Sequence, residues 1–213
     1  KLRCDSEKRN KDTKLKAAKR PENIRKNRYR DVLPYDHSRV KLNSKDNDYI
    51  NASFVPIKQA DRFHILCQGP LPHTAGDLWQ MVWEQNSPAV IMLNRLVEKD
   101  MIKCHQYFPA CPPLNRYQLP SNNNNISPNS DNSCSVANNY NDVQSVEPLH
   151  FDSSGFVVTL LSETKLANFT KRIISLKQVS TGKERNVAHF QYTTWPDFGV
   201  PNNTDDFLEF LLE

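Results

Sequence analysis

The composition of this chain changes abruptly between Pro112 and Pro148, and this change limits which residues can form a hydrophobic core. Ten asparagines fall between Asn115 and Asn141, together with many serines and almost no large aliphatic side chains. Such a segment cannot bury enough apolar surface to offset the entropy lost on ordering, so we expect residues 112–148 to be disordered. A long insertion between two strands costs little free energy. The core must therefore come from the residues on either side.

Before the insertion, the apolar residues recur with the periods of strands and of one helix. Tyr49–Val55 and Phe63–Cys67 predict strands, and Ala89–Leu93 is an apolar run typical of a strand buried on both faces. Between them, the apolar residues that follow Thr74 recur with helical spacing. Thr74 and Asp77, three residues apart, resemble a capping box at the start of this helix.

After the insertion, three further strands and a helix are expected. The strands are Phe156–Leu161, Arg172–Val179 and Val187–Thr193, with a hairpin turn at residues 180–183 between the last two. Thr204 is expected to cap the helix, because the two acidic residues after it favour a helix N-terminus. Strands and helices mixed around one core predict an α/β domain, with a central twisted mixed sheet flanked by helices.

The charge of the chain is unevenly distributed. The 213 residues suffice for one good-sized domain, and their net charge is +4. Residues 1–30 hold 13 Lys/Arg against 4 Asp/Glu, a balance of +9, so the remainder, with 15 against 20, has a balance of −5. A basic arm can bind nucleic acid, an anionic membrane or acidic peptides, or can simply be a solvated terminus. We expect a flexible arm over residues 1–20 and a domain over 21–213. We expect no nucleic-acid binding, since Tyr29 is the only aromatic residue in the basic stretch.

The cysteines and the apolar runs exclude several classes of protein. Five cysteines are scattered without CxxC or Cys/His spacing, which argues against a disulfide framework and against a zinc site. No apolar run approaches the roughly 18 residues of a membrane span, and the N-terminus does not resemble a signal peptide. We therefore expect reduced thiols, no metal, no membrane segment in this chain and a cytoplasmic location.

Near its C-terminal end the chain places one carboxylate on a stiff frame of aromatic residues and prolines. The segment Thr193-Thr194-Trp195-Pro196-Asp197-Phe198-Gly199-Val200-Pro201 contains two prolines and a glycine, so it should be a loop. Trp195 and Phe198 provide apolar anchors, while Asp197 is free to deliver a proton. A general acid typically contributes a factor of about 10²–10⁴ in rate. The alternative is a surface turn in which Asp197 bonds only the backbone.

These nine residues resemble the acid loop of the cysteine-dependent protein-tyrosine phosphatases, and Lys26-Asn27-Arg28-Tyr29-Arg30-Asp31 resembles the phosphotyrosine-recognition loop of that family. The residues of these motifs are most similar to those of the non-receptor class, in particular to the intracellular group of phosphatase 1B and T-cell phosphatase. The resemblance runs from about Pro21 to Glu213, apart from the insertion. Framework segments of the family also match in the expected order, at residues 47–53, 68–72, 81–85, 92–95 and 97–99.

The resemblance implies that phosphotyrosine in proteins is hydrolysed through a cysteinyl-phosphate intermediate, without a metal or an organic cofactor. Asp197 would protonate the departing tyrosinate, because free phenol has a pKa of about 10 and its anion is a poor leaving group near neutral pH. The same carboxylate would then activate the water that cleaves the intermediate. Trp195, Pro196 and Phe198 would support the loop.

The resemblance also assigns residues to substrate binding. Tyr29 resembles the aromatic wall of a deep slot in which the substrate ring stacks, the alternative being an ordinary surface tyrosine. Asp31 would accept hydrogen bonds from the substrate backbone, and Arg30 would attract acidic residues that flank the phosphotyrosine. Lys103 corresponds to a lysine that meets the closed acid loop, and Glu98 to a carboxylate that orients the arginine of the family's signature.

One departure outweighs these matches. The family's nucleophile lies in a Cys-x5-Arg loop, and none of the five cysteines is followed by arginine at that spacing. Cys104 has no phosphate loop around it, so we do not expect it to be a nucleophile. We therefore expect a phosphatase fragment that is inactive alone, monomeric, and directed to phosphotyrosine-containing proteins, the alternative being a pseudophosphatase that binds phosphopeptides. Three histidines match no catalytic role in the family: His64, His73 and His189.

Overall fold

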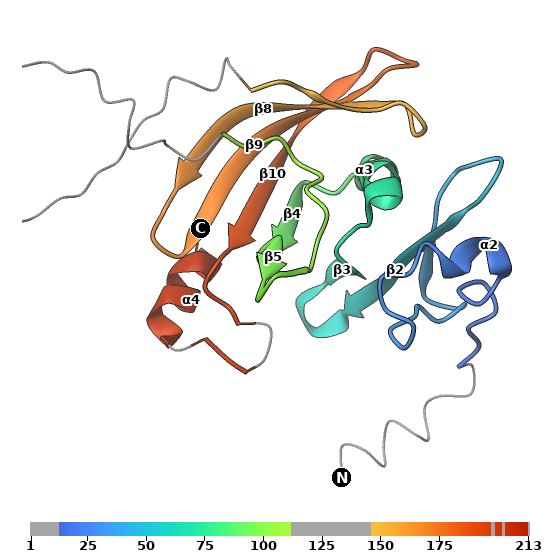
Figure 1. The fold of residues 1–213 in the computed structure, drawn as a ribbon, viewed down its shortest axis with the longest axis horizontal. Helices are drawn as coiled ribbons and strands as arrows, with labels where there is room; N and C mark the ends of the chain where they lie inside the picture. The colour runs from blue at the N-terminus through green and yellow to red at the C-terminus, as the bar shows by residue number, and fades with distance from the viewer. Residues whose placement is uncertain (1–12, 112–145, 197–198, 202, 213) are drawn as a thin grey trace, which may run out of the picture.

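The computed structural model describes residues 13–111, 146–196, 199–201 and 203–212. Half of its ten described strands belong to a five-stranded sheet with the order β4-β10-β9-β8-β7 (Figure 1). All neighbouring strands are antiparallel except β4 and β10, which run parallel, so the sheet is mixed. The strands are β4 (Ala89–Met92), β7 (Leu149–Phe151), β8 (Phe156–Lys165), β9 (Phe169–Gln178) and β10 (Glu184–Tyr192).

A second, antiparallel sheet of three strands is built from the first part of the chain. It contains β1 (Arg39–Lys41), β2 (Tyr49–Ile57) and β3 (Arg62–Cys67), in that order. The short helix α2 (Pro21–Ile24) precedes it, and the 3-10 turn η1 (Lys58–Ala60) joins β2 to β3. The predicted α/β class is confirmed, although the described strands form two main sheets instead of one.

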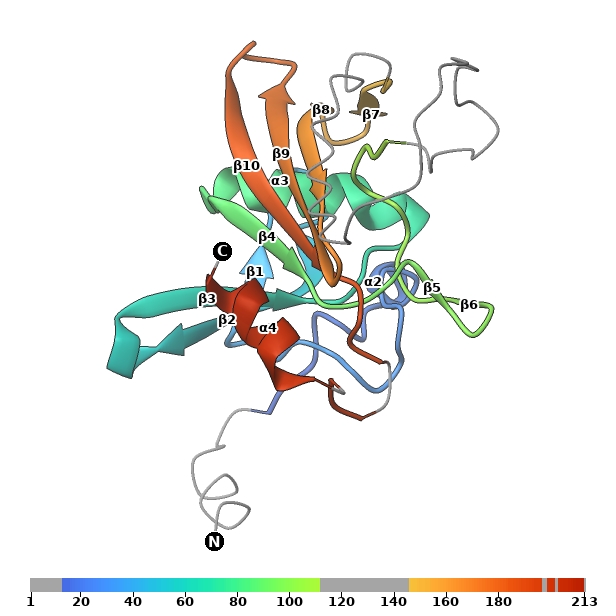
Figure 2. The same cartoon turned by 90° about the vertical axis from the view of Figure 1, so that its left-hand side faces the viewer.

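The helix α3 (Ala75–Glu84), which follows the 3-10 turn η2 (Pro72–Thr74), lies between the two sheets (Figures 1 and 2). Its apolar face is buried in the main core, which confirms the helical spacing predicted there. Trp79 is completely buried, and its indole N–H donates a 2.7 Å hydrogen bond to the carbonyl oxygen of Tyr107. A buried Trp needs such a partner for its one polar atom.

The predicted strands after the insertion are confirmed, and so is the hairpin turn between β9 and β10. Gly182 has a φ of 66°, in the left-handed region that favours glycine, and its N–H donates to the carbonyl oxygen of Gln178 at 2.9 Å. Residues 112–145 of the predicted disordered insertion lie outside the described residues. Val146, near the end of that insertion, packs partly against the main core.

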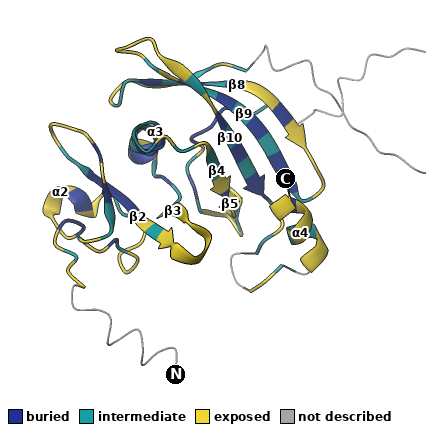
Figure 3. Cartoon of the chain, turned by 180° about the vertical axis from the view of Figure 1, so that it is seen from behind, coloured by how far each residue is buried: buried dark blue, intermediate teal, exposed yellow. Residues whose placement is uncertain are grey.

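The strand β4 is buried less completely than predicted for Ala89–Leu93. It forms the edge of the five-stranded sheet and pairs only with β10 among the described strands. Ile91 is 61% exposed and Leu93 is 46% exposed, so burial on both faces was a wrong prediction. Figure 3 shows where burial is more complete: the middle of β9 and β10 is buried, whereas much of α4 (Thr204–Leu212) is exposed. An apolar run indicates a strand but does not say which neighbours it has.

The predicted capping box of α3 is also wrong. Thr74 makes no side-chain cap; its hydroxyl instead accepts a 2.9 Å hydrogen bond from the N–H of Leu71. The carboxylate of Asp77 forms an ion pair with Lys26 at 3.1 Å, so it does not reach back to the helix start. The side chain that the local pattern assigned to a helix cap thus pairs with a residue that is distant in the sequence.

The cap of α4 lies one residue earlier than predicted. The side-chain oxygen of Asn203 accepts a 3.0 Å hydrogen bond from the N–H of Asp205, whereas Thr204 is the first residue of the helix. The helix packs against the ends of β9 and β10 through Phe210, whose ring lies 5.4 Å from that of Phe169. No helix within the described ranges is long and apolar enough to cross a membrane.

The last part of the predicted flexible arm, residues 1–20, belongs to the fold. Ala17 and Ala18 are buried against the start of β2. The carboxylate of Asp36 accepts hydrogen bonds of 2.9 Å from the backbone N–H groups of Lys16 and Ala17. These contacts order the described part of the arm, while its first twelve residues lie outside the described part of the chain.

A network of buried polar side chains crosses the five-stranded sheet. Arg172 donates to Glu163 at 2.6 Å and to Gln191 at 3.2 Å, and its guanidinium lies 3.4 Å from Nδ1 of His189. Because arginine can only donate, Nδ1 accepts, and Nε2–H donates to the hydroxyl of Tyr107 at 2.9 Å. This supports a structural role for the histidine, whose pKa is lowered to about 3 by burial and by the charge of Arg172.

We predict that His189 makes the fold sensitive to mild acid. Its pKa is about 3 when folded and 6.5 when unfolded, so the unfolded chain alone takes up a proton as pH falls below 6.5. The free energy of unfolding should thus fall by about 2 kcal/mol between pH 7 and pH 5 from this group alone. Urea denaturation at both pH values should show a smaller loss for His189→Gln. Equal losses in the two proteins would contradict the prediction.

Candidate substrate-recognition site

The loop after α2 is held in place by the side chain of Arg28. Its guanidinium donates to three carbonyl oxygens: Gly69 at 2.8 Å, Pro70 at 2.6 Å and Ile102 at 3.2 Å. Its backbone N–H donates to the side chain of Gln68 at 2.8 Å. Arginine suits this role because its planar group presents several donors in a fixed geometry. One residue thereby ties the loop to two segments that are distant in the sequence.

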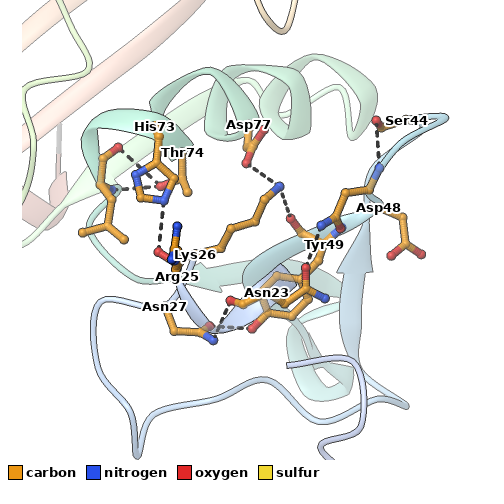
Figure 4. A network of polar contacts seen from close by, with 12 residues as sticks. Asn23, Arg25, Lys26, Asn27, Ser44, Asp48, Tyr49, His73, Thr74 and Asp77 are labelled. Atoms are coloured by element: carbon orange, nitrogen blue, oxygen red, sulfur yellow. Dashed lines mark hydrogen bonds and ion pairs between the residues drawn. The ribbon is translucent and has the colours of Figure 1, made fainter. Parts of the chain in front are cut away.

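Lys26 and Asn27 also anchor this loop, through hydrogen bonds to residues of β2 and α3 (Figure 4). The side-chain oxygen of Asn27 accepts hydrogen bonds from the hydroxyl of Tyr49 at 2.6 Å and from the amide of Asn51 at 2.9 Å. Lys26 donates to Asp77 at 3.1 Å and to the carbonyl oxygen of Tyr49 at 3.2 Å. Burial raises the pKa of Tyr49 to about 12, so its hydroxyl remains a donor at neutral pH.

The three residues that follow these anchors are exposed. Tyr29 is 43% exposed, and Arg30 and Asp31 are also at the surface. The loop thus has a fixed backbone and free side chains, which is the arrangement needed to bind another molecule without first ordering the loop. These are the three residues of the loop that were predicted to contact substrate.

A close approach of two backbones positions Lys103 beside this loop. A Cβ atom on Gly69 would lie 2.8 Å from the carbonyl oxygen of Lys103 and 3.1 Å from Cβ of Cys104, so only glycine fits there. The N–H of His105 also donates to the carbonyl oxygen of Pro70 at 2.9 Å. Burial raises the pKa of the Cys104 thiol to about 12, so the neutral thiol is the favoured form near neutral pH.

The predicted residue Glu98 lies in a small hairpin formed by β5 (Val97–Glu98) and β6 (Met101–Ile102). Lys103 follows this hairpin directly, and its N–H donates to the carbonyl oxygen of Leu96 at 2.8 Å. Glu98 thus lies in the hairpin and Lys103 directly after it, and Ile102 at the end of the hairpin is one of the residues that Arg28 contacts.

The predicted acid loop emerges next to this hairpin because β4 and β10 are parallel. The carboxyl ends of parallel strands lie at the same end of a sheet. The chain segments that follow Met92 and Tyr192 therefore start next to each other. The side chain of Arg95 donates to the carbonyl oxygen of Thr193, and the amide of Gln191 donates to Asn94 at 3.3 Å. Figures 1 and 2 both draw the hairpin, the loop after α2 and the connection into α4 on the lower side of the molecule.

The start of the acid loop is fixed by aromatic packing. The ring of Trp195 lies 5.1 Å from that of Phe207 in α4, and its indole N–H donates to Gly199 at 3.4 Å. Pro196 is half-buried. Asp197 and Phe198, the predicted general acid and its neighbour, lie outside the described residues.

Three residues that hold the loops of the candidate site in place were missed in the sequence analysis. Arg28, Gly69 and Arg95 were not singled out, although each bonds or approaches a segment far away in the chain. One usable signal was Gly69, because the chain has only 5 glycines and this one precedes a proline outside a hairpin turn.

Residues 23–213 match the sequence profile of the family described as protein-tyrosine phosphatase. The chain therefore belongs to the protein-tyrosine phosphatase family. Phosphatases of the non-receptor class are among its curated relatives. It is 46% identical, over 93% of its length, to tyrosine-protein phosphatase non-receptor type 2 of Mus musculus. It is 39% identical, over 99% of its length, to non-receptor type 61F of Drosophila melanogaster. The chain spans 40% of the first of these relatives and 33% of the second.

We predict that Arg28→Ala lowers the free energy of unfolding by about 2–4 kcal/mol, because partly buried carbonyl oxygens lose a charged donor. Arg30→Ala, a change of the same type at an exposed position of the same loop, should alter it by no more than about 0.5 kcal/mol. Urea denaturation of both variants measures the difference. Equal effects would show that the contacts of Arg28 do not stabilise the fold.

Proposed function

We propose that this protein acts on phosphotyrosine in other proteins and that the described loops provide its substrate recognition. One observation carries the proposal: an anchored loop with exposed Tyr29, Arg30 and Asp31 is linked through Arg28 to the β5–β6 hairpin. That hairpin leads, through Arg95, to the segment that contains the predicted acid. Three segments from different parts of the sequence thus meet at one side of the molecule.

In this proposal the aromatic ring of the substrate stacks on Tyr29 in a slot. A phosphotyrosine reaches the bottom of a deep slot, whereas phosphoserine is too short. Asp31 accepts hydrogen bonds from the substrate backbone and fixes its register. Arg30, being exposed, adds a modest attraction for acidic residues beside the phosphotyrosine.

Asp197 acts as the general acid in this proposal. It protonates the tyrosine oxygen as the P–O bond breaks, because the tyrosinate ion is a poor leaving group near neutral pH. The resulting carboxylate then takes a proton from the water that attacks the cysteinyl-phosphate. Trp195, Pro196 and Phe198 form the frame of this loop, and the packing of Trp195 on Phe207 supports that role.

Lys103 and Glu98 complete the proposed site. Lys103 meets the acid loop when it closes, and Glu98 orients the arginine of the phosphate-binding signature. These 213 residues contain no Cys-x5-Arg sequence, so we assign neither the nucleophile nor the phosphate cradle to any of them. The reaction in this form uses no metal or organic cofactor. We further propose a cytoplasmic monomer that acts on phosphotyrosine-containing proteins and does not bind nucleic acid.

A second candidate function is phosphopeptide binding without catalysis, as in a pseudophosphatase. The observation that favours it is the ordered, exposed recognition loop, which can bind a peptide whether or not catalysis follows. The two candidates predict the same binding surface and differ in turnover.

We predict that this 213-residue chain does not hydrolyse a phosphotyrosyl peptide, since it lacks the nucleophile. Phosphate release measured with and without vanadate should equal that of Asp197→Asn. Vanadate-sensitive release that disappears in Asp197→Asn would overturn the predicted inactivity and would identify the acid at the same time.

We also predict that the chain binds a phosphotyrosyl peptide more tightly than its unphosphorylated form, as measured by calorimetry. Tyr29→Ala should weaken this binding by about 3–10-fold, because a stacked aromatic pair contributes roughly 0.5–1.5 kcal/mol beyond buried area. Tyr35→Ala is the matched control, since Tyr35 is 37% exposed but stacks with His37 outside the loop. Equal binding of both peptides would refute the proposed recognition role.

A further inference from the structure

A cleft of about 690 Å³ opens beside the second half of α3, away from the loops of the proposed site. It is bounded by the end of β1, the start of β8 and the end of β9, and none of its lining residues belongs to the recognition loop, the β5–β6 hairpin or the acid segment. Its volume falls in the range of ligand sites in proteins. The proposed phosphatase function gives this cleft no role.

Two aromatic rings lie among the residues that line the cleft. Trp83 and Phe156 line it, and their ring centroids are 5.8 Å apart. The guanidinium of Arg185 lies 5.6 Å from the Trp83 ring and is itself held by hydrogen bonds to the carbonyl oxygens of Ser87 at 2.9 Å and Val82 at 2.7 Å. The indole is therefore immobilised before any ligand arrives, which reduces the entropy lost on binding.

Four of the nine residues that line the cleft carry side-chain carboxamides: Asn43, Gln80, Gln85 and Gln178. Each carboxamide both donates and accepts hydrogen bonds, as a peptide group does. In the part of the chain that the structure describes, the side chains of Asn43 and Gln85 and the indole N–H of Trp83 have no hydrogen-bond partner. These groups are available to a ligand that lies along the cleft.

Two charged side chains of opposite sign line the cleft, Lys41 and Glu84, and they differ in the partners they already have. The carboxylate of Glu84 already accepts hydrogen bonds from the N–H of Asn43 at 3.0 Å and from Gln80 at 2.8 Å. Lys41 lines the cleft and makes no salt bridge with any described residue, while Asp48 in the same sheet is paired with Arg39 at 2.7 Å. Of the two charged side chains that line the cleft, Lys41 is thus the one without a hydrogen bond or ion pair to a described residue, whereas Glu84 keeps its negative charge among neutral donors.

We infer that this cleft binds an extended segment of a partner protein, with an aromatic or long aliphatic side chain on Trp83 and a carboxylate beside Lys41. The carboxamides then pair with the N–H and C=O groups of its backbone. A nucleic acid fits poorly, because Glu84 and a single lysine give no basic surface. A wholly apolar ligand would leave the carboxamides and Lys41 without partners.

Nuclear magnetic resonance of the whole ¹⁵N-labelled chain tests this inference. The probes are capped peptides that contain one Asp and one Phe, separated by one, two or three alanines. At least one peptide should shift the indole N–H signal of Trp83 and the side-chain amide signals of Asn43 and Gln85 in a saturable way. Unmoved signals at millimolar peptide, or shifts confined to the loop around Tyr29, would overturn the inference.

Two variants test the charge and the peptide character of the ligand. Lys41→Gln should weaken binding by about 2–5-fold, the effect of one exposed ion pair, and should remove the preference for Asp over Asn in the peptide. Lys45→Gln, an exposed lysine of the same hairpin outside the cleft, should have no effect. If Lys41→Gln retains the preference, the carboxylate does not bind there. If free phenylacetate shifts the same signals as strongly as the peptide, the site is one for small acids, and the peptide proposal fails.

Discussion

The proposed site depends on the guanidinium of Arg28. Its three acceptors are backbone carbonyl oxygens, two of them in the segment that approaches the chain after β6 and the third in β6 itself. Backbone acceptors cannot rotate away, so the position of the loop is set by main-chain geometry instead of by flexible side chains. Without this contact, the described residues would offer no direct bond between the recognition loop and the β5–β6 hairpin.

The second constraint is the parallel pairing of β4 with β10. It brings the residues after both strands to one edge of the sheet, where Arg95 joins them through Thr193. The buried network behind this edge continues the connection, because Gln191 bonds both Arg172 inside the sheet and Asn94 at the edge. The segment that leads to Asp197 therefore begins on rigid structure.

The parts of this arrangement that could be predicted are those with a local signal. The exposure of Tyr29, the helix around Trp79 and the turn at Gly182 each follow from residues close in sequence. The parts that could not be predicted depend on distant partners. Asp77 resembled part of a helix cap because it follows Thr74 by three residues, but its actual partner, Lys26, is 51 residues away. The exposure of Ile91 depends on which strands lie beside β4.

The helix α3 contacts the recognition loop and also lines the cleft, yet its packing indicates that the two sites act independently. Its first turn meets the recognition loop through Asp77, and its last turns line the cleft through Gln80 and Trp83. Energetic coupling between two sites requires an element with two arrangements that both ligands bias. In α3, six buried residues and the bonded indole of Trp79 fill the core, and a close-packed core resists small displacements. A ligand in the cleft should therefore leave the affinity of the recognition loop unchanged, because the packing of α3 opposes the displacement that would connect the two surfaces.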